Sequence, residues 1–489
     1  MSSPSKNILW LSVSRIASLI LLFLAYTQLF RYLGPYQAGQ FQFVLSYATL
    51  FGVVIDFGIQ QYIIKKISED RSKAKKYFHN FLAVEVVLAA LVYGAMVSFA
   101  VYSGYEPIVL KAIMVAGLGV ALHGLTYPFL SVITAFYDLK KAAFLNFLGS
   151  VINFAVIFLT IWTAGSIVML TLQQVIYSSI AVIVYYFLVQ KHIGKPEVLK
   201  GLRSLDWKLV RTIFIAALPF ALLVGFSTIY NRIDVVLITR YLGYEQTGLY
   251  TAAYKFFDLL AFFPAVVSHA LYPLFATLMS QGKTMEIRSI LEKYLRFMVV
   301  ISLPIAVGTS IMARPIVTLV AGEEFAAAAP VLAVLVWAPT VLFMYIVVNA
   351  LVISQLTKFA MAVTGANVLV NIIGNLILLP RIGIIGAAIM TIISELIQGT
   401  FYFYFVRKKI TNFRFFSMVW KPAIASLVMG LLVWQIRSMH LLIVIAIAAI
   451  IYGLILFALR FFKRDDISFV YSLIGKSFVP EESNLERYR

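Results

Sequence analysis

Apolar runs of eighteen or more residues recur along this chain from Leu9 to Phe462. A helix rises about 1.5 Å per residue, so about 20 apolar residues are needed to cross the hydrocarbon core of a bilayer. Transmembrane strands would instead appear as segments of about ten residues that alternate apolar and polar side chains. The run from Leu441 to Leu459 does not alternate. The sequence therefore predicts an all-α integral membrane protein with about fourteen transmembrane helices.

The apolar runs and the loops between them set the predicted helix boundaries. The predicted helices span residues 8–30, 38–64, 78–102, 108–136, 142–163, 166–189, 212–238, 248–279, 291–313, 329–354, 359–379, 384–406, 419–436 and 440–462. The connecting segments are short, and those on the outside are the shortest, so there is no room for a separate catalytic domain. We therefore expect a protein that is not an enzyme.

The composition excludes several other classes of protein. The chain is 62% hydrophobic and 12% charged, whereas soluble domains are about half apolar and about a quarter charged. It has no cysteine, which excludes disulfides, thiolate metal sites and thiol catalysis. The five histidines show no spacing typical of metal ligands. No metal and no organic cofactor are expected.

The net charge of +19 would suit a nucleic-acid-binding protein, but the placement of the charge favours a different interpretation. Basic residues gather in every second loop, starting from the N-terminal side, as cytoplasmic loops of membrane proteins do. The opposite loops hold only Arg31, Arg240, Arg314, Arg381 and Arg437. The pattern predicts a multi-pass protein of the cell (cytoplasmic) membrane with both termini in the cytoplasm, and no nucleic-acid partner.

An internal repeat indicates two similar halves. Arg31-Tyr32-Leu33-Gly34 recurs as Arg240-Tyr241-Leu242-Gly243, and Gln37 and Gly39 have counterparts at the same spacing in Gln246 and Gly248. Each half holds an even number of helices, so we expect a pseudo-twofold axis along the membrane normal, as in transporters that alternate access to a central site. The predicted parts are an N-terminal six-helix bundle (1–190), a cytoplasmic linker (191–211), a C-terminal six-helix bundle (212–406), two additional helices (419–462) and a cytoplasmic tail (463–489).

Three stretches carry a resemblance to a known family. They are Arg31 to Gly39 followed by Asp56-Phe57-Gly58, residues 322 to 330, and Asn367 to Pro380 followed by residues 383 to 388. In order and spacing the chain resembles the Wzx-type flippases of O-antigen and other lipid-linked oligosaccharides, within the multidrug/oligosaccharidyl-lipid/polysaccharide (MOP) exporter superfamily. The resemblance implies translocation of an oligosaccharide on a polyprenyl diphosphate carrier, with the first, second, seventh and eighth helices lining the cavity.

Four basic residues fall inside predicted helices: Arg15, Lys111, Arg232 and Lys255. A base near a helix centre costs about 2.5–3.5 kcal/mol on insertion scales, so it normally faces a polar cavity or a partner. Lys111 lies near a helix end and can extend to the interface. Arg15, Arg232 and Lys255 are predicted to bind the anionic headgroup. The alternative for Lys255 is an internal ion pair with Asp258, three residues further on the same face.

Polar groups elsewhere in the predicted helices suggest two further roles. Of five acids within spans (Asp56, Glu85, Asp234, Asp258 and Glu395), we favour Asp56, Asp258 and Glu395 for coupling transport to Na⁺ or H⁺. Asn367, Asn371 and Asn375 lie on one helical stripe. Asn371 is predicted to bind sugar hydroxyls, and interhelical hydrogen bonding is the alternative for the whole stripe.

The predicted function is transport of a lipid-linked oligosaccharide from the cytoplasmic to the outer leaflet. Its expected partners are that substrate and membrane lipids, with transient contacts to glycan-assembly proteins. Two alternatives stay open. A drug or cation antiporter of the same superfamily should have an acid-lined cavity, and a membrane-embedded glycan polymerase or ligase should have a large outer loop with paired catalytic groups.

Overall fold

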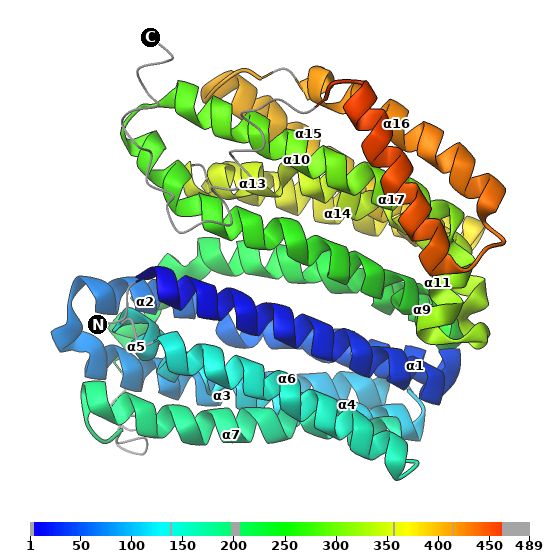
Figure 1. The fold of residues 1–489 in the computed structure, drawn as a ribbon. Coiled ribbons are helices and arrows are strands. Elements are labelled where there is room, and N and C mark those ends of the chain that lie inside the picture. Colours follow the sequence, from blue (N-terminus) through cyan, green and yellow to red (C-terminus); the bar gives the residue numbers. More distant parts are fainter. Residues whose placement is uncertain (1–3, 137–138, 197–205, 356, 414, 462–489) are drawn as a thin grey trace. The chain divides into compact units, whose positions relative to one another are not determined.

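The computed structural model describes residues 4–136, 139–196, 206–355, 357–413 and 415–461. Side chains are described from residue 18 onward, except at 139–143, 269, 270, 273, 350, 352–355 and 357. Throughout these ranges every regular element is helical, which confirms the all-α prediction (Figure 1). The elements are α1 (Pro4–Asp56), α2 (Ile59–Glu69), η1 (Arg71–Lys73), α3 (Ala74–Tyr102), α4 (Pro107–Gly124), α5 (Tyr127–Ala135), α6 (Leu139–Trp162), α7 (Ile167–Ile193), α9 (Trp207–Ser280), α10 (Thr284–Ile311), α11 (Ala313–Ala321), η2 (Glu323–Ala328), α12 (Ala329–Leu335), α13 (Trp337–Gln355), α14 (Thr357–Ile382), α15 (Ile384–Lys409), α16 (Phe415–Ile436) and α17 (Leu441–Ala458).

The two longest helices each combine two predicted helices across a kink. Gly34 in α1 has φ 65° and Gly243 in α9 has φ 85°. Only glycine adopts this left-handed region at little cost, because it has no Cβ. The repeated Arg-Tyr-Leu-Gly motif therefore marks the bend in each half of the chain.

Three helices that were predicted as continuous are broken in the structure. The predicted helix at 38–64 is interrupted at Phe57 and Gly58, which have φ values of 43° and 66°. The predicted helix at 108–136 divides into α4 and α5, and α5 starts with a proline in its first turn, where the missing N–H is tolerated. The predicted helix at 329–354 divides into α12 and α13, and the segment formed by η2 and α12 is bent by 40° from α13.

The described residues contain eleven helices long and apolar enough to cross a membrane, or up to twelve if the bent pair forms one span. Two of these, α1 and α9, are far longer than one span needs, because each continues across its glycine kink. The multi-pass membrane architecture is confirmed. The count of fourteen stays a prediction.

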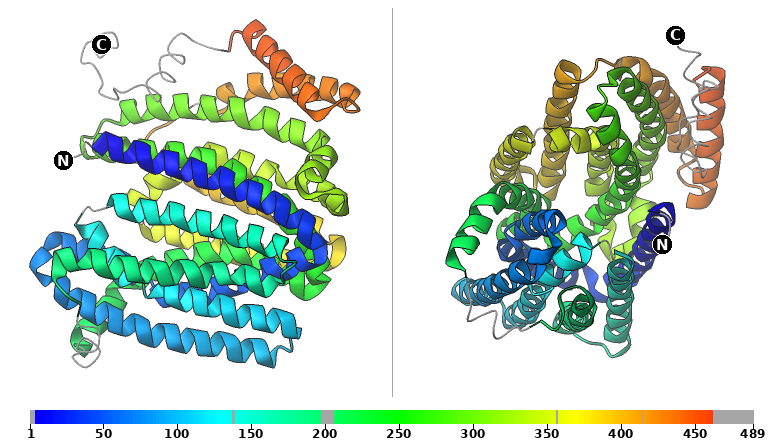
Figure 2. Two further views of the ribbon diagram at one scale, coloured as in Figure 1. Left: turned by 60° about the horizontal axis from the view of Figure 1, so that its bottom comes forward. Right: turned by 90° about the vertical axis from the view of Figure 1, so that its left-hand side faces the viewer.

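The chain forms two compact units. The first comprises Met1–Leu260, Val317–Leu335 and Gln355–Gln398, and the second comprises Ala261–Ile316, Val336–Ser354 and Gly399–Arg489. In the first unit α4 packs against α1, α3 and α7, and α6 packs against α1 and α7 (Figures 1 and 2). A separate apolar core joins α2, α3 and α5 around Ile63, Phe78 and Val132, which are all fully buried. The predicted division at residues 190 and 212 follows the sequence repeat and stays a prediction.

In the second unit α10, α16 and α17 pack together. Their common core includes Met312, Met429, Val444 and Leu456. The Tyr452 hydroxyl of α17 donates to the Val300 carbonyl of α10 at 2.8 Å. The two additional helices predicted at 419–436 and 440–462 correspond to α16 and α17 (Figure 1).

Within the first unit the two copies of the repeat touch each other. A Cβ added to Gly39 would lie 1.7 Å from the Tyr244 carbonyl oxygen, and one added to Gly248 would lie 1.9 Å from the Pro35 carbonyl oxygen. Pro35 and Tyr244 are themselves equivalent positions of the repeat. The contact is therefore self-complementary, as at a twofold axis, and it requires glycine at both positions.

Candidate functional site

A polar cavity of about 240 Å³ lies within the first unit, between α1 and the two parts of α9. Its mouth and walls combine hydroxyl, amide and charged groups, which are unusual among the apolar side chains of a transmembrane bundle. The lining residues are Thr49, Ser227, Thr228, Asn231, Arg232, Tyr254 and Asp258. Arg232 is the one base that the structure places in this lining.

Arg232 reaches the cavity because helical spacing puts it on the same face as Thr228. One residue earlier, the Asn231 amide folds back and donates to the Ser227 carbonyl oxygen at 2.6 Å. Arg232 is half-buried, and among the residues with described side chains it forms no ion pair. Its five N–H donors are therefore available to an anion, and the planar fork suits phosphate oxygens.

Lys255 forms the internal ion pair that was the alternative to headgroup binding. Its Nζ lies 3.6 Å from Asp258 Oδ2, and 4.3 Å from the ring centre of Tyr26 on α1. The Phe23 and Phe256 rings, with centroids 6.2 Å apart, hold the same two helices together. Asp258 is one of the residues that line the cavity. Its ion-pair partner Lys255 therefore lies next to the lining.

Arg15 lies in α1, but its side chain is outside the described residues. It precedes Phe23 by eight positions, or about 12 Å along a helix. Its predicted role in headgroup binding stays a prediction.

A buried polar cluster joins α9, α14 and α15. The Asp234 carboxylate accepts hydrogen bonds from Asn375 Nδ2 at 2.9 Å, from the Tyr250 hydroxyl at 3.1 Å and from Thr391 Oγ1 at 3.4 Å. Asn371 is fully buried, and its amide donates to Ser394 Oγ at 3.2 Å. The asparagine stripe thus forms interhelical hydrogen bonds, and Asn371 does not line the cavity.

Sequence reasoning missed how these groups combine. Asp234 was one of five acids but was not among those favoured, because nothing in the sequence shows that it faces the asparagine stripe of α14. Tyr250 and Thr391 carried no signal at all. The regular spacing of the three asparagines was the only sequence feature that indicated a polar cluster on α14.

The three acids favoured for ion coupling lie in different places. Glu395 is buried and accepts a hydrogen bond from the Tyr230 hydroxyl at 2.7 Å. Asp258 lines the polar cavity. Asp56 is the last residue of α1. The described residues contain no cluster of three or more potential metal ligands.

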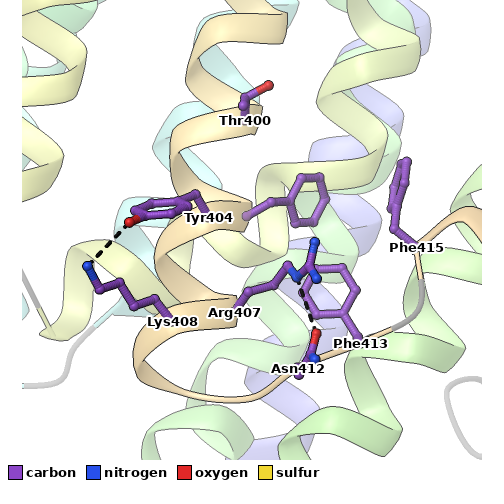
Figure 3. A pocket seen from close by; sticks show the side chains of 8 residues that line it. Thr400, Tyr404, Arg407, Lys408, Asn412, Phe413 and Phe415 are labelled. Carbon is purple, nitrogen blue, oxygen red and sulfur yellow. Dashed lines mark hydrogen bonds between the residues drawn. The ribbon is translucent and has the colours of Figure 1, made fainter.

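A separate pocket of about 690 Å³ lies in the second unit at the C-terminal end of α15 (Figure 3). Arg407 Nε donates to Asn412 Oδ1 at 3.2 Å, and Lys408 Nζ donates to the Tyr404 hydroxyl at 3.2 Å. Phe403, Phe413 and Phe415 supply its aromatic side. Arg407 and Lys408 are exposed at the end of α15. This pocket therefore differs from the polar cavity of the first unit, which lies within a helix bundle.

The chain matches the profiles of two known protein families. The profile of the polysaccharide biosynthesis protein family matches residues 5–279, which is more than half of the chain and includes the whole polar cavity. The chain belongs to this family. The MatE profile also matches, over residues 219–377, so the chain is a member of the MOP superfamily.

Similar proteins agree with this assignment. The uncharacterized membrane protein MJ1068 of Methanocaldococcus jannaschii is 23% identical over 78% of this chain and 79% of its own length. The probable low-salt glycan biosynthesis flippase Agl15 of Haloferax volcanii is 22% identical over 87% and 88%. The lipid II flippase MurJ, in an inward closed conformation, shares the fold with a TM-score of 0.75 at 15% identity, covering 91% of this chain and 97% of its own.

Proposed function

We propose that this family member carries a lipid-linked oligosaccharide, on a polyprenyl diphosphate, from the cytoplasmic to the outer leaflet by alternating access. The observation that supports it most is the position of Arg232, half-buried in a polar cavity and without an acidic partner among the described side chains. A base that is partly withdrawn from water without a partner is unfavourable, so this arrangement suits a site that receives an anion.

The cavity chemistry matches a sugar diphosphate. The diphosphate would accept paired hydrogen bonds from the Arg232 guanidinium, with Arg15 as a second proposed ligand. Lys255 would turn from Asp258 to the same anion, because its flexible stem carries a movable point charge. The hydroxyls of Thr49, Ser227 and Thr228 would take part in hydrogen bonds with the first sugar.

The cavity size bears on the transport cycle. Sites that enclose a drug-sized ligand measure about 300–1,000 Å³, whereas this cavity is about 240 Å³. It has room for a diphosphate but not for an oligosaccharide. We therefore propose that the six-helix bundles (1–190 and 212–406) rock apart to admit the glycan, while the lipid tail stays in the bilayer.

The same proposal includes coupling to Na⁺ or H⁺. Asp234 is 5% exposed, and its described hydrogen-bond partners are neutral, so a proton or a monovalent cation would neutralise it. This makes Asp234 a better candidate for coupling than Asp258, whose charge Lys255 already offsets. We further propose cytoplasmic termini, placement in the cytoplasmic membrane and transient contacts with glycan-assembly proteins.

A drug or cation antiporter is the second candidate, because the MatE profile matches α9 to α14 and Asp258 lies in the cavity lining. A cation would have to bind beside Arg232 and displace Lys255 from Asp258. Both steps are unfavourable, so the anionic substrate is preferred.

The test is translocation of a fluorescent polyprenyl diphosphate oligosaccharide in proteoliposomes. Arg232→Ala and Arg15→Ala should each lose most of the activity of the parent. Arg240→Ala, on the same helix but outside the cavity, is the matched control and should retain it. A folded parent without activity, or full activity in Arg232→Ala and Arg15→Ala, would contradict the proposal.

A further inference from the structure

Glu85 in α3 is a fully buried acid that the proposed translocation pathway does not use. Its exposed fraction is 0%, and neither carboxylate oxygen has a hydrogen-bond partner among the described residues. A buried carboxylate without a partner is stable only if something neutralises it. No base forms an ion pair with it within the described part of the chain.

A second acid lies at the end of the neighbouring helix α1. Asp56 is half-buried, and the preceding residue, Ile55, borders the same position as Glu85: a Cβ added to Gly124 would lie near both side chains. Two neighbouring carboxylates do not both ionise readily, because like charges repel in a poorly solvated site. The pair is therefore suited to share one proton.

The walls around the pair come from α1, α4 and α5. A Cβ added to Gly124 of α4 would lie 3.5 Å from Glu85 Oε2 and 2.4 Å from Ile55 Cγ2, so the bare glycine makes room for the carboxyl group. Of the titratable groups on α4 and α5, Tyr127 is within electrostatic range of both acids, and His123 has a buried Nδ1 without a hydrogen-bond partner among the described residues. The His123 and Tyr127 ring centroids are 5.4 Å apart.

Asp56 also holds the break between α1 and α2. Its Oδ1 accepts a hydrogen bond from the Gln60 backbone N–H at 3.3 Å, across the turn at Phe57 and Gly58. A Cβ added to Gly58 would lie 2.5 Å from the backbone nitrogen of Ala221 on α9. The turn that Asp56 stabilises is thus in close contact with the helix that carries Arg232.

We propose that Glu85 and Asp56 form a proton-binding site in the first unit, in which Glu85 holds the proton while the Asp56 carboxylate caps the turn before α2. Loss of the proton would place two charges together, weaken the cap and loosen the contact between Gly58 and α9. The link to transport rests on the proposed function, whereas proton binding itself does not.

Infrared titration of the purified full-length protein in lipid tests the site without any substrate. The parent should show a protonated carboxyl C=O band at neutral pH that shifts in D₂O, and Glu85→Gln should remove that component. Glu69→Gln changes an exposed acid that pairs with Lys66 at 2.8 Å, and this control should retain it. In Asp56→Asn the band should be lost at a lower pH than in the parent, because the neutral amide removes the negative charge that disfavours ionisation of Glu85.

Several outcomes would overturn the site. These are a parent without the band, a band unchanged in Glu85→Gln, or a band that Na⁺ removes at constant pH, which would indicate a cation site instead. If Glu85→Gln does not fold, Glu85→Asp keeps the carboxyl group and should keep a band at a changed titration midpoint. If Glu85→Gln folds, its transport activity in proteoliposomes should lose the pH dependence of the parent. Inactivity of the parent would count against the proposed function and leave the infrared result standing.

Discussion

At the scale of single residues, the cavity contains opposing charges whose removal should have opposite effects. Arg232 forms no ion pair among the described side chains, whereas Asp258 lies 3.6 Å from Lys255 and would compete with an anion for it. Charge-assisted hydrogen bonds contribute about 1.5–3 kcal/mol, which corresponds to roughly 10- to 100-fold in affinity.

We therefore expect Arg232→Ala to weaken binding of a short-chain polyprenyl diphosphate by roughly 10- to 100-fold. Asp258→Asn should strengthen it, because it releases Lys255. Titration calorimetry in detergent measures both, with Arg240→Ala as the control. If Asp258→Asn bound the diphosphate more weakly than the parent, release of Lys255 would not favour an anion, and the anion site would be contradicted. A cationic substrate, in contrast, should bind Asp258→Asn more weakly than the parent.

The sequence selected these residues by their charge, but it could not show most of their contacts. Insertion cost alone selected Arg232 and Lys255, because a base inside an apolar helix needs a polar neighbour. The Lys255–Asp258 pair follows from helical spacing. Asp234 could not be recognised, because its partners Tyr250, Asn375 and Thr391 come from different segments of the fold, and only packing brings them to one carboxylate.

At the scale of elements, α9 is fixed at its start by Asp206. The carboxylate accepts a hydrogen bond from the Leu209 N–H at 3.0 Å and pairs with Lys76 of α3 at 2.8 Å. The Lys76 ammonium lowers the pKa of the Asp206 carboxyl from its ordinary value of 3.8. Because the folded-state pKa is the lower one, the stabilisation is present above the ordinary value and is lost as the pH falls through the folded-state value.

Asp206→Asn should therefore lower the Tm slightly at pH 7, since asparagine keeps the cap but not the ion pair. Asp206→Ala should lower it further. Both differences from the parent should shrink as the pH falls below about 4. Differential scanning fluorimetry between neutral and acidic pH checks this, and a gap between parent and Asp206→Asn that is constant with pH would rule out the ion pair as the cause.

The contact between the two repeats makes a second prediction about elements. Gly39→Ala and Gly248→Ala should each destabilise the protein by about 1–3 kcal/mol, the usual cost of overpacking, because the added Cβ meets a carbonyl oxygen below 2 Å. Gly225→Ala, on the same helix as Gly248 but with nothing within 4 Å, should be neutral or stabilising. Guanidinium unfolding of the three variants measures the difference, and equal stabilities would refute the close contact.

Helix existence was predictable, but the breaks within helices were not. Hydropathy cannot distinguish α4 and α5 from one long helix, because both are apolar and the interruption lies at Leu125 and Thr126. Gly34 and Gly243, by contrast, have non-helical backbone angles and lie between helices that the sequence predicted as separate. The repeated motif showed that these positions matter, but the left-handed backbone that explains the glycines appears only in the structure.

At the scale of the whole molecule, the absence of cysteine makes the proposed orientation directly testable. Ser72, in η1 beside Asp70 and Lys73, is exposed, as is Ser103 at the opposite end of α3. The basic segment near Ser72 should be cytoplasmic by the positive-inside rule. A single cysteine at each position reports the two sides of the membrane, because no other thiol competes.

We expect a membrane-impermeant maleimide to label Ser103→Cys in intact cells and Ser72→Cys only after permeabilisation. The reverse pattern would invert the orientation and with it the proposed direction of transport. The same cysteine-free background extends the test to the cycle itself. Thr228→Cys lines the cavity on the helical face of Arg232, so alternating access predicts that diphosphate substrate changes its labelling rate, whereas a static bundle would leave that rate unchanged.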